Sequence, residues 1–340
     1  MSNEVVSLAS GNEGSLKDQF SAYLSRLRSG EMGSLPAVVA TIVLAVIFEI
    51  ASPFFFTKLN FTNLFVQASE LTMLSAALVF VILLAEIDLS AGVTAGVAMA
   101  VWIVLVKSGV VNWIVALVVA FIVGLFIGWI IGLMVAKIGV PSFVVTLAFF
   151  LGFQGMQLVL LGEGGVYRVE VPEILAIMNN NMPDWAGWVL VGASAVTMFV
   201  LATWDRGRRA RKGLVNKPIS MLYIKIGAVL VLGGAAVAIM NQDRSQGSIP
   251  ISGVPIVVPI TVVILFIGSF VLDRTKFGRH LYAVGGNPEA ARRAGIKVAK
   301  IRIYAFMICA FLAACESFPR PPNKLTPPTT AAATPERTIV

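Results

Sequence analysis

A series of apolar runs, each about as long as a membrane-spanning helix, constrains this chain more than any other feature. A helix needs about 20 apolar residues to cross the roughly 30 Å hydrocarbon core of a bilayer. Charged residues make up only 13% of the 340-residue sequence, about half of their usual share in soluble domains. We therefore predict an all-α, polytopic transmembrane helical bundle with eight complete spans, at residues 35–51, 64–85, 90–106, 110–136, 140–161, 185–203, 221–240 and 251–272.

A ninth apolar run, at residues 303–315, is shorter than the others. Thirteen residues extend only about 20 Å as a helix, so we expect a truncated ninth span. We interpret residues 1–34 as a cytoplasmic segment, 35–315 as an incomplete transmembrane domain, and 316–340 as a proline-rich, disordered or non-native tail. A truncated or frame-shifted gene is favoured over a natural tail, because the break falls inside a helix rather than at its boundary.

Basic residues are distributed unevenly between alternate connections of the predicted spans. Lys137, the stretch RGRRARKGLVNK at 206–217 and the region 274–302 fall on one side of the membrane. Cytoplasmic loops carry the excess of lysine and arginine, so this side and the N-terminus are predicted to be cytoplasmic. The formal net charge of +8 then reflects membrane topology, and we expect no nucleic-acid partner.

Glycines recur at every fourth position of the run GLFIGWIIGL. Gly124, Gly128 and Gly132 share one helical face, and small residues let neighbouring transmembrane helices approach closely. We predict that this face packs against another helix, with a substrate-lining or hinge face as the alternative. Gly92 and Gly96 indicate a similar contact in SAGVTAGVAMA.

Two carboxylates stand between apolar runs in the stretch AEIDLSAG at residues 85–92. Asp88 or Ser90 could cap the next helix by accepting hydrogen bonds from its free N–H groups. Ionisable groups at membrane depth are costly and often functional. Glu86, Asp88 and Ser90 are therefore also candidates for a pathway that carries a polar solute or protons; a cap does not require Glu86.

Polar side chains also interrupt the apolar run VPSFVVTLAFFLGFQGMQ at residues 140–157. Ser142 and Thr146 are four residues apart and share a helical face, and Phe153 and Gln154 follow them. Hydroxyl, amide and aromatic groups suit a sugar-like solute, whereas hydrogen bonding between helices is the commoner use of such side chains. These four residues are substrate-pathway candidates, with that alternative open.

The stretch GGNPEAARRAGI, residues 285–296, lies on the predicted cytoplasmic side between the last two apolar runs. After a Gly-Gly-Asn-Pro turn signal, Asn287 and Pro288 are typical of a helix start and Gly295 of its end. Such a short helix is not stable alone in water, so we expect it to dock in a groove. Its small face and its basic residues would contact another protein through Ala290, Ala291, Ala294, Arg292 and Arg293.

Taken together, AEIDLS, VPSFVVTLA and FGRHLYAVGGNPEAARRAGI resemble the membrane permease subunits of bacterial sugar ABC importers of the ribose and xylose type. The resemblance covers residues 35–314, includes the basic insert at 206–217, and implies D-xylose as the sugar. It implies that residues 287–295 form the coupling helix on which a separate ATPase docks. The contacts implied are Gly285, Gly286, Asn287, Pro288, Glu289, Ala290, Arg292, Arg293 and Gly295.

The resemblance also implies the partners of such a permease. These are an ABC ATPase subunit, a periplasmic sugar-binding protein and a second permease subunit in a homodimer, all in or at a cell inner membrane whose lipid surrounds this multi-pass chain. No G-x-x-x-x-G-K-[ST] loop occurs in the sequence. ATP and Mg are therefore expected on the partner ATPase, with no cofactor and no metal bound by this chain.

Other functional classes fit less well. A proton-coupled secondary sugar transporter would use Glu86 and Asp88 as coupling groups, and a truncated, non-functional permease is a further alternative. An intramembrane enzyme is disfavoured because the sequence offers one histidine, His280 in a basic loop, and no metal-ligand spacing. Cys309 and Cys315 lie in the last apolar run and are interpreted as core thiols.

Overall fold

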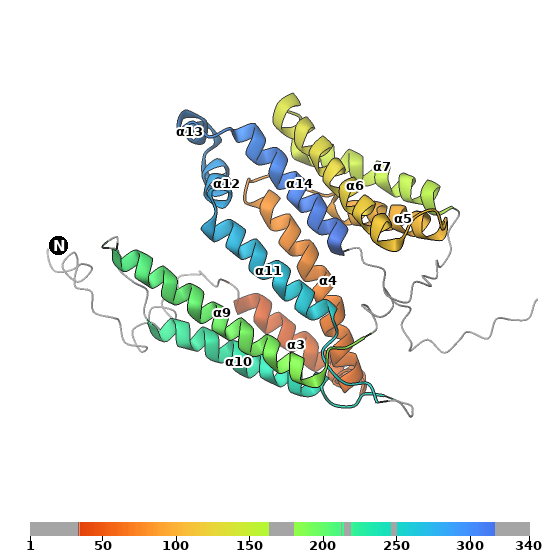
Figure 1. The fold of residues 1–340 in the computed structure, drawn as a ribbon, viewed down its shortest axis with the longest axis vertical. Coiled ribbons are helices and arrows are strands. Elements are labelled where there is room, and N and C mark those ends of the chain that lie inside the picture. Colours follow the sequence, from red (N-terminus) through yellow and green to blue (C-terminus); the bar gives the residue numbers. More distant parts are fainter. Residues whose placement is uncertain are drawn as a thin grey trace, which may run out of the picture. The chain divides into compact units, whose positions relative to one another are not determined.

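A computed structural model describes residues 33, 35–162, 180–211, 213, 219–245 and 250–316. The predicted N-terminal segment lies outside these residues except for Gly33, and so does the predicted tail beyond Glu316. Within the described ranges, the regular structure is helical apart from one isolated β-bridge between Asn181 and Pro255. The predicted all-α, polytopic fold is confirmed (Figure 1).

Each predicted apolar run corresponds to a helix. Among the described residues, seven helices are long and apolar enough to cross a membrane: α4 (Lys58–Ile82), α6 (Trp113–Leu133, continued by the π-helix η1, Met134–Ile138), α7 (Ser142–Leu161), α9 (Asp184–Arg211), α10 (Ile219–Met240), α11 (Val257–Arg274) and α14 (Val298–Glu316). Two further apolar helices, α3 (Leu35–Ala51) and α5 (Ala91–Lys107), have 17 residues each. Two short helices, α12 (Lys276–Gly286) and α13 (Pro288–Arg293), lie between α11 and α14.

The ninth apolar helix is longer than the sequence indicates. α14 has 19 residues and reaches membrane-spanning length, so the prediction of a thirteen-residue truncated span is wrong. Lys300 and Arg302 interrupt the apolar run in the sequence, yet both lie within the first turns of α14. Near the end of a spanning helix, a long basic side chain such as Lys300 can keep its charged head at the interface while its stem packs on apolar surface, whereas Arg302 pairs with Glu86.

The chain divides into two compact units, of which unit 1 comprises Met1–Ala68 and Asn181–Pro259. Within unit 1, α9 and α10 pack side by side. Glycine makes this contact close: a Cβ added at Gly187 would lie 3.0 Å from the Val237 side chain. Val237, Met240 and Val254 form the buried apolar cluster of the unit.

The connection that follows α10 in unit 1 is held by its own polar groups. The guanidinium of Arg244 is buried and donates to the backbone carbonyl of Met240, the last residue of α10, and to that of Gly253 in the connection. The Asp243 carboxylate accepts the backbone N–H groups of Ser245 and Ile251 at 2.9 and 3.1 Å. Because residue 251 takes part in these bonds, α11 begins only at Val257, later than the apolar run predicts.

Unit 2, Ser69–Asn180 and Ile260–Val340, is organised around the contact of α14 with α6 (Figure 1). A Cβ added at Gly128 would lie 2.5 Å from the carbonyl oxygen of Phe306, and one at Gly132 would lie 2.8 Å from the Cα of Ile303. Gly124 likewise faces α14. The glycine face of α6 is therefore a helix-packing face, as the first of the two alternatives predicts.

The second pair of glycines behaves differently. A Cβ at Gly96 would lie 2.7 Å from the amide group of Gln157 on α7, so Gly96 does provide a close contact. A Cβ at Gly92 would meet no described atom within 4 Å, so the packing prediction is wrong for this residue. The two positions are one helical turn apart, and only the second faces the Gln157 side chain.

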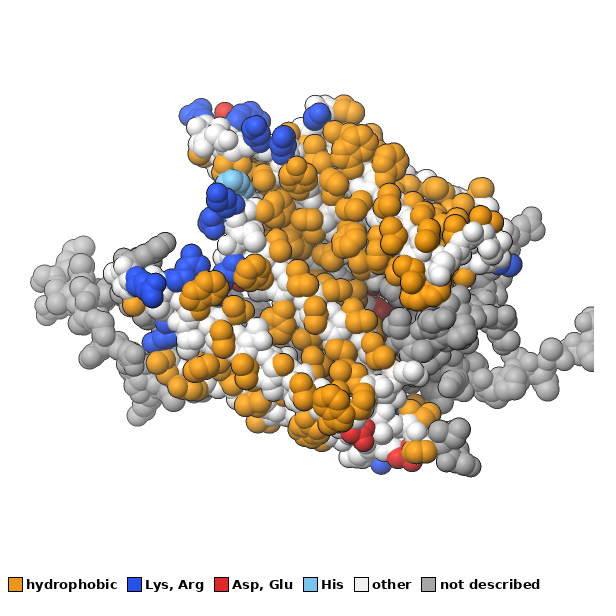
Figure 2. All heavy atoms as spheres, viewed as in Figure 1, with side chains coloured by type: hydrophobic (Ala, Val, Ile, Leu, Met, Phe, Trp, Pro, Cys, Tyr) orange, Lys and Arg blue, Asp and Glu red, His pale blue; other side chains and the backbone are white. Residues whose placement is uncertain are grey.

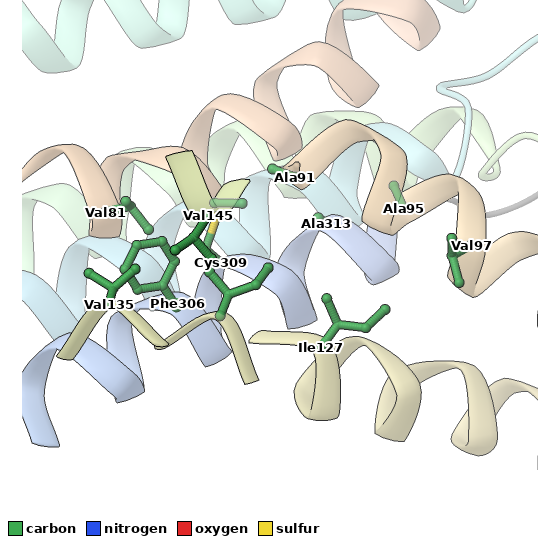
Figure 3. Close-up of a cluster of buried hydrophobic side chains, with 12 residues drawn as sticks. Val81, Ala91, Ala95, Val97, Ile127, Val135, Val145, Phe306, Cys309 and Ala313 are labelled. Carbon is green, nitrogen blue, oxygen red and sulfur yellow. The ribbon is translucent and has the colours of Figure 1, made fainter. Parts of the chain in front are cut away.

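The core of unit 2 gathers side chains from α4, α5, α6, η1, α7 and α14. Figure 3 shows the Phe306 ring beside Val81 and Val135, with Cys309 close to Val145. Phe306 and Cys309 are fully buried. The interpretation of Cys309 as a core thiol is confirmed.

The outer surfaces of the helices are strongly apolar. Large side chains such as Val159, Ile50 and Leu232 are at least 70% exposed, and hydrophobic side chains cover most of the helix surface visible in Figure 2. A soluble monomer rarely exposes apolar patches beyond a few hundred Å². The surface is that of a protein whose helices face lipid.

Candidate functional site: a helix break held by three helices

The connection between α4 and α5, residues 83–90, is a helix break that carries both carboxylates of the AEIDLS motif. The Ala85 N–H donates to the Ile82 carbonyl at 2.9 Å, and the Glu86 N–H donates to the Val81 carbonyl at 3.3 Å. This pair of bonds is a Schellman motif, whose left-handed position usually holds glycine. Here that position is Ala85 (φ 58°), and no other non-glycine residue in the described chain has a positive φ.

Asp88 lies buried at the end of this break. Its Oδ1 accepts the backbone N–H of Ser90 at 2.8 Å and the Ser90 hydroxyl at 2.7 Å, and the carboxylate also bonds the backbone of Ala91. Asp88 therefore caps the start of α5, as predicted. Ser90 is the formal N-cap residue but makes no capping bond with its own side chain.

Helix α14 supplies a partner for each carboxylate. The Cys309 thiol hydrogen-bonds to Asp88. The Arg302 guanidinium lies 3.2 Å from the Glu86 carboxylate, and these side chains are only 27% and 13% exposed. A charge removed from water needs such a partner, so the break is tied to α14 at two points.

Helix α7 holds the same break through its first turns. The Ser142 hydroxyl accepts the Ile87 N–H at 3.1 Å, and the Thr146 hydroxyl donates to the Ile87 carbonyl at 3.3 Å and to the Ser142 carbonyl at 2.9 Å. Both α7 side chains are buried. The structure thus brings Ser142 and Thr146 together with Glu86, Asp88 and Ser90 around one stretch of non-helical backbone.

Two other candidates on α7 lie apart from this group. The Phe153 ring lies tilted against the Phe149 ring, with ring centroids 5.1 Å apart, and packs against the core of unit 2. Gln154 is exposed on the outer side of α7. The amide that does reach a neighbouring helix belongs to Gln157, which donates to the Val93 carbonyl at 3.0 Å.

The GGNPEAARRAGI stretch contacts the helix break directly. A Cβ added at Gly285 would lie 1.8 Å from the carbonyl oxygen of Leu83, the first residue after α4. Only a residue without a side chain fits there. Gly285 and Gly286 are the last residues of α12, so the turn predicted over Gly-Gly-Asn-Pro is partly wrong: the chain changes direction at Asn287, between α12 and α13. His280 also lies in this helix and not in a loop.

The predicted short helix itself is confirmed as α13. Asn287 caps it by accepting the Ala290 N–H at 2.9 Å, Pro288 is its first residue, and Gly295 (φ 82°) follows its end. The predicted free alanine face is partly wrong, because Ala291 is buried against Leu281, Val284 and other residues of unit 2.

The charged residues of α13 are exposed and paired with each other. Glu289 lies 3.1 Å from Arg292 and 3.8 Å from Arg293. Exposed ion pairs of this kind contribute only a few tenths of a kcal/mol, about 0.2–0.5. They can therefore be exchanged for contacts with a partner at little cost.

Arg302 and Cys309, which hold the two carboxylates, are not among the candidates that the sequence indicates. For Arg302 a signal exists: one arginine stands between Ile301 and Ile303 inside an apolar stretch. For Cys309 there is none, since its hydrogen bond depends on how α14 packs against the break. Among the described residues, no group of three or more His, Cys, Asp or Glu side chains is arranged to hold a metal ion.

Comparison with known proteins places this arrangement in a family. Residues 60–315 match the family described as the permease component of the branched-chain amino acid transport system. The chain belongs to this permease family. The match begins in α4 and ends in α14, so it contains the helix break, α7 and α13.

Curated relatives narrow the resemblance. The permease is 31% identical over 298 residues to the xylose transport system permease protein of Haemophilus influenzae, covering 85% of this chain and 75% of the relative. It is 33% identical over 267 residues to the corresponding protein of Escherichia coli K12, covering 75% and 63%. The ribose import permease protein of the same strain is 28% identical over 277 residues, covering 82% and 65%.

The permease thus spans less than two thirds of the length of its Escherichia coli relatives. No solved structure matches it. The seven helices of spanning length and the family together identify the chain as a multi-pass membrane protein, as the sequence predicts.

Proposed function

We propose that this permease is the membrane subunit of an ABC importer that carries D-xylose across the cell inner membrane. Two of the relatives described above are xylose permeases, at 31% and 33% identity. A separate ATPase, carrying ATP and Mg, docks on α13, and the chain needs no ATP site of its own. A periplasmic sugar-binding protein delivers the sugar, and a second permease subunit completes the pathway.

The observation that supports coupling most directly is the contact between Gly285 and Leu83. A Cβ at Gly285 would overlap the Leu83 carbonyl, so the end of α12 and the end of α4 pack backbone against backbone. α13 follows Gly286 after a single residue, Asn287. A displacement of α13 is therefore passed to the helix break with no flexible side chain between them.

Buried packing keeps α13 and its neighbours together during such a movement. Ala291 of α13 shares an apolar cluster with Leu281 and Val284 of α12 and with Val298 of α14. Interiors packed in this way transmit strain and do not absorb it. We infer that ATPase closure moves α12, α13 and the start of α14 as one body.

The break at residues 83–90 is the part of the pathway that would respond. Asp88, Ser90, Ser142 and Thr146 place hydroxyl and carboxylate groups beside non-helical backbone, which membrane proteins tolerate where it lines a cavity or is buried in protein. Glu86 anchors the break to Arg302. Phe153 and Gln154 lie on other surfaces of α7, away from the break. They would contact the sugar only if another part of the transporter packed against those surfaces and lined the pathway with them.

Co-purification tests the docking surface. Ala290 is an exposed alanine of α13, and Ala210 is an exposed alanine near the end of α9, on the same predicted side. With the ABC ATPase of a xylose importer as bait, Ala290→Arg should abolish recovery of the permease, while Ala210→Arg should leave it unchanged. Glu289→Lys should also reduce recovery. Equal recovery of Ala290→Arg and wild type would exclude α13 as the docking helix.

A further inference from the structure

A basic hollow lies where α14 begins. It has a volume of about 380 Å³ and is lined by Ala136 of η1, Arg292 of α13 and residues between Ile296 and Arg302. Figure 2 shows Lys and Arg side chains gathered over α13 and the adjacent start of α14. This volume is more than ten times the volume that one molecule occupies in liquid water, roughly 30 Å³. It is large enough for a polyatomic ligand.

The charges around this hollow are not balanced. Four cationic side chains line it: Arg292, Lys297, Lys300 and Arg302. Two of them have carboxylate neighbours, Glu289 for Arg292 and Glu86 for Arg302. Lys297 and Lys300 form no ion pair with any residue in the described part of the chain, and no acidic side chain lines the hollow. The hollow therefore carries a net positive charge that an anion would neutralise.

Arg302 adds a directed donor to this charge. One of its terminal nitrogens is engaged with Glu86 at 3.2 Å. Its Nε is buried and has no hydrogen-bond partner among the described residues. Arginine presents its donors in a planar fork that suits carboxylate and phosphate oxygens, so the guanidinium can bond Glu86 and an oxyanion together.

The remaining lining is apolar and lies at the ends of membrane helices. Ala136, Val298 and Ala299 contribute to it, and Ile138, two residues after Ala136, is 70% exposed. η1 and the start of α14 both lie on the predicted cytoplasmic side, at the ends of helices of membrane-spanning length. A free oxyanion would contact only the basic side chains of the hollow. A ligand that joins an anionic group to an apolar body would contact both the basic side chains and the apolar lining. Basic pockets between transmembrane helices on this side of a membrane bind lipid headgroups.

We propose that this hollow binds the phosphate of an anionic phospholipid headgroup, with Lys297, Lys300 and Arg302 as its ligands. Arg302 then links the lipid to the helix break through Glu86. The inference does not depend on the sugar or on the ATPase.

Titration of the purified full-length permease with single lipids tests the site. Native mass spectrometry would count phosphatidylglycerol molecules bound in detergent, with phosphatidylcholine as the neutral lipid and inorganic phosphate as the headgroup without its lipid. Lys297→Gln with Lys300→Gln should weaken phosphatidylglycerol binding on the order of tenfold. The control variant, Lys276→Gln with Arg279→Gln, removes two exposed charges from α12 outside the hollow and should bind like wild type. Lys297→Arg with Lys300→Arg should also bind like wild type.

Three results would overturn the proposal. One is equal loss of phosphatidylglycerol in the hollow variant and in the α12 control, which would mean diffuse attraction to charge. Another is displacement of bound phosphatidylglycerol by inorganic phosphate, which would identify a soluble anion as the ligand of the hollow. The third is unchanged lipid binding in the hollow variant combined with loss of ATPase recovery, which would assign the basic groups to a protein partner. Gel filtration of each variant confirms that it is folded.

Discussion

The carboxylate of Glu86 lies 3.2 Å from the guanidinium of Arg302, which joins the α4–α5 break to the first turns of α14. Three elements meet at this ion pair. They are the helix break, helix α14, against which the glycine face of α6 packs, and the segment that leads to α13. The pair is largely withdrawn from water, so removal of either partner leaves a charge without compensation. It is the clearest place at which to test how the break is held.

Glu86→Gln should lower the free energy of unfolding by about 1–3 kcal/mol, because Arg302 loses its charged partner in a half-buried position. Thermal unfolding in detergent measures the change. Arg302→Gln should cost a similar amount, and the double variant should cost less than the sum of the two. Strict additivity in this cycle would show that the pair contributes nothing.

Ala85→Gly should stabilise the permease by about 1 kcal/mol, because a left-handed backbone is costly for alanine and not for glycine. Gly295 (φ 82°) occupies the equivalent position of the Schellman motif that ends α13, with the Gly295 and Ile296 N–H groups donating to Arg292 and Ala291. Gly295→Ala is the reverse experiment and should destabilise by a similar amount. If Ala85→Gly lowers the melting temperature, the break is not held in the left-handed conformation.

Gly285→Ala should uncouple ATP hydrolysis from transport, because its new Cβ would push the end of α12 away from Leu83. The neighbouring residue provides a matched control, since a Cβ at Gly286 would meet no described atom within 4 Å. The measurement is the ratio of sugar transported to ATP hydrolysed, which should fall in Gly285→Ala and stay at the wild-type value in Gly286→Ala. An equal ratio in Gly285→Ala, Gly286→Ala and wild type would show that the Gly285–Leu83 contact does not transmit movement.

The helices of this permease follow from sequence because a run of about 20 apolar residues has few other structures available. The helix boundaries cannot be read from the sequence in the same way, since they depend on contacts with other parts of the chain. Helix α11 begins late because the Ile251 N–H is bonded to Asp243. Helix α14 begins early because Arg302 in its first turns forms an ion pair with Glu86. The missed helix α12 has a detectable signal. Phe277, Leu281 and Val284 recur at helical spacing in an otherwise polar stretch.

The candidate site was less accessible to prediction than the helices. The cap formed by Asp88 and the short helix from Pro288 depend on local chemistry, and local chemistry is visible in the sequence. The grouping of Asp88 with Cys309, Ser142 and Thr146 depends on the packing of three helices, which no spacing in the sequence encodes. Gln154 and Gln157 illustrate this limit of sequence-based prediction. They are three residues apart on α7, yet the Gln154 amide is exposed and the Gln157 amide donates to α5.

The connection after α10 should keep its structure to low pH. The backbone N–H groups of Ser245, first, and of Ile251 hold the pKa of the Asp243 carboxyl below its usual range. A group whose pKa is lowered on folding stabilises the fold above its ordinary pKa and loses that contribution as pH falls through the lowered value. Hydrogen exchange at the Ile251 amide, corrected for intrinsic rates, should be constant from neutral pH to about pH 5 and should rise only in more acidic solution. Asp243→Asn should exchange faster than wild type at neutral pH, and a protected Ile251 amide in that variant would contradict this account.

Sugar uptake by reconstituted vesicles tests the central claim most directly. Proteoliposomes would contain the permease with the ATPase and the sugar-binding protein of a xylose importer, and labelled D-xylose would be followed with and without ATP. Our account predicts uptake that requires ATP and the ATPase, is lost in Ala290→Arg and persists in Ala210→Arg. Uptake driven by a proton gradient in vesicles that lack the ATPase would contradict it.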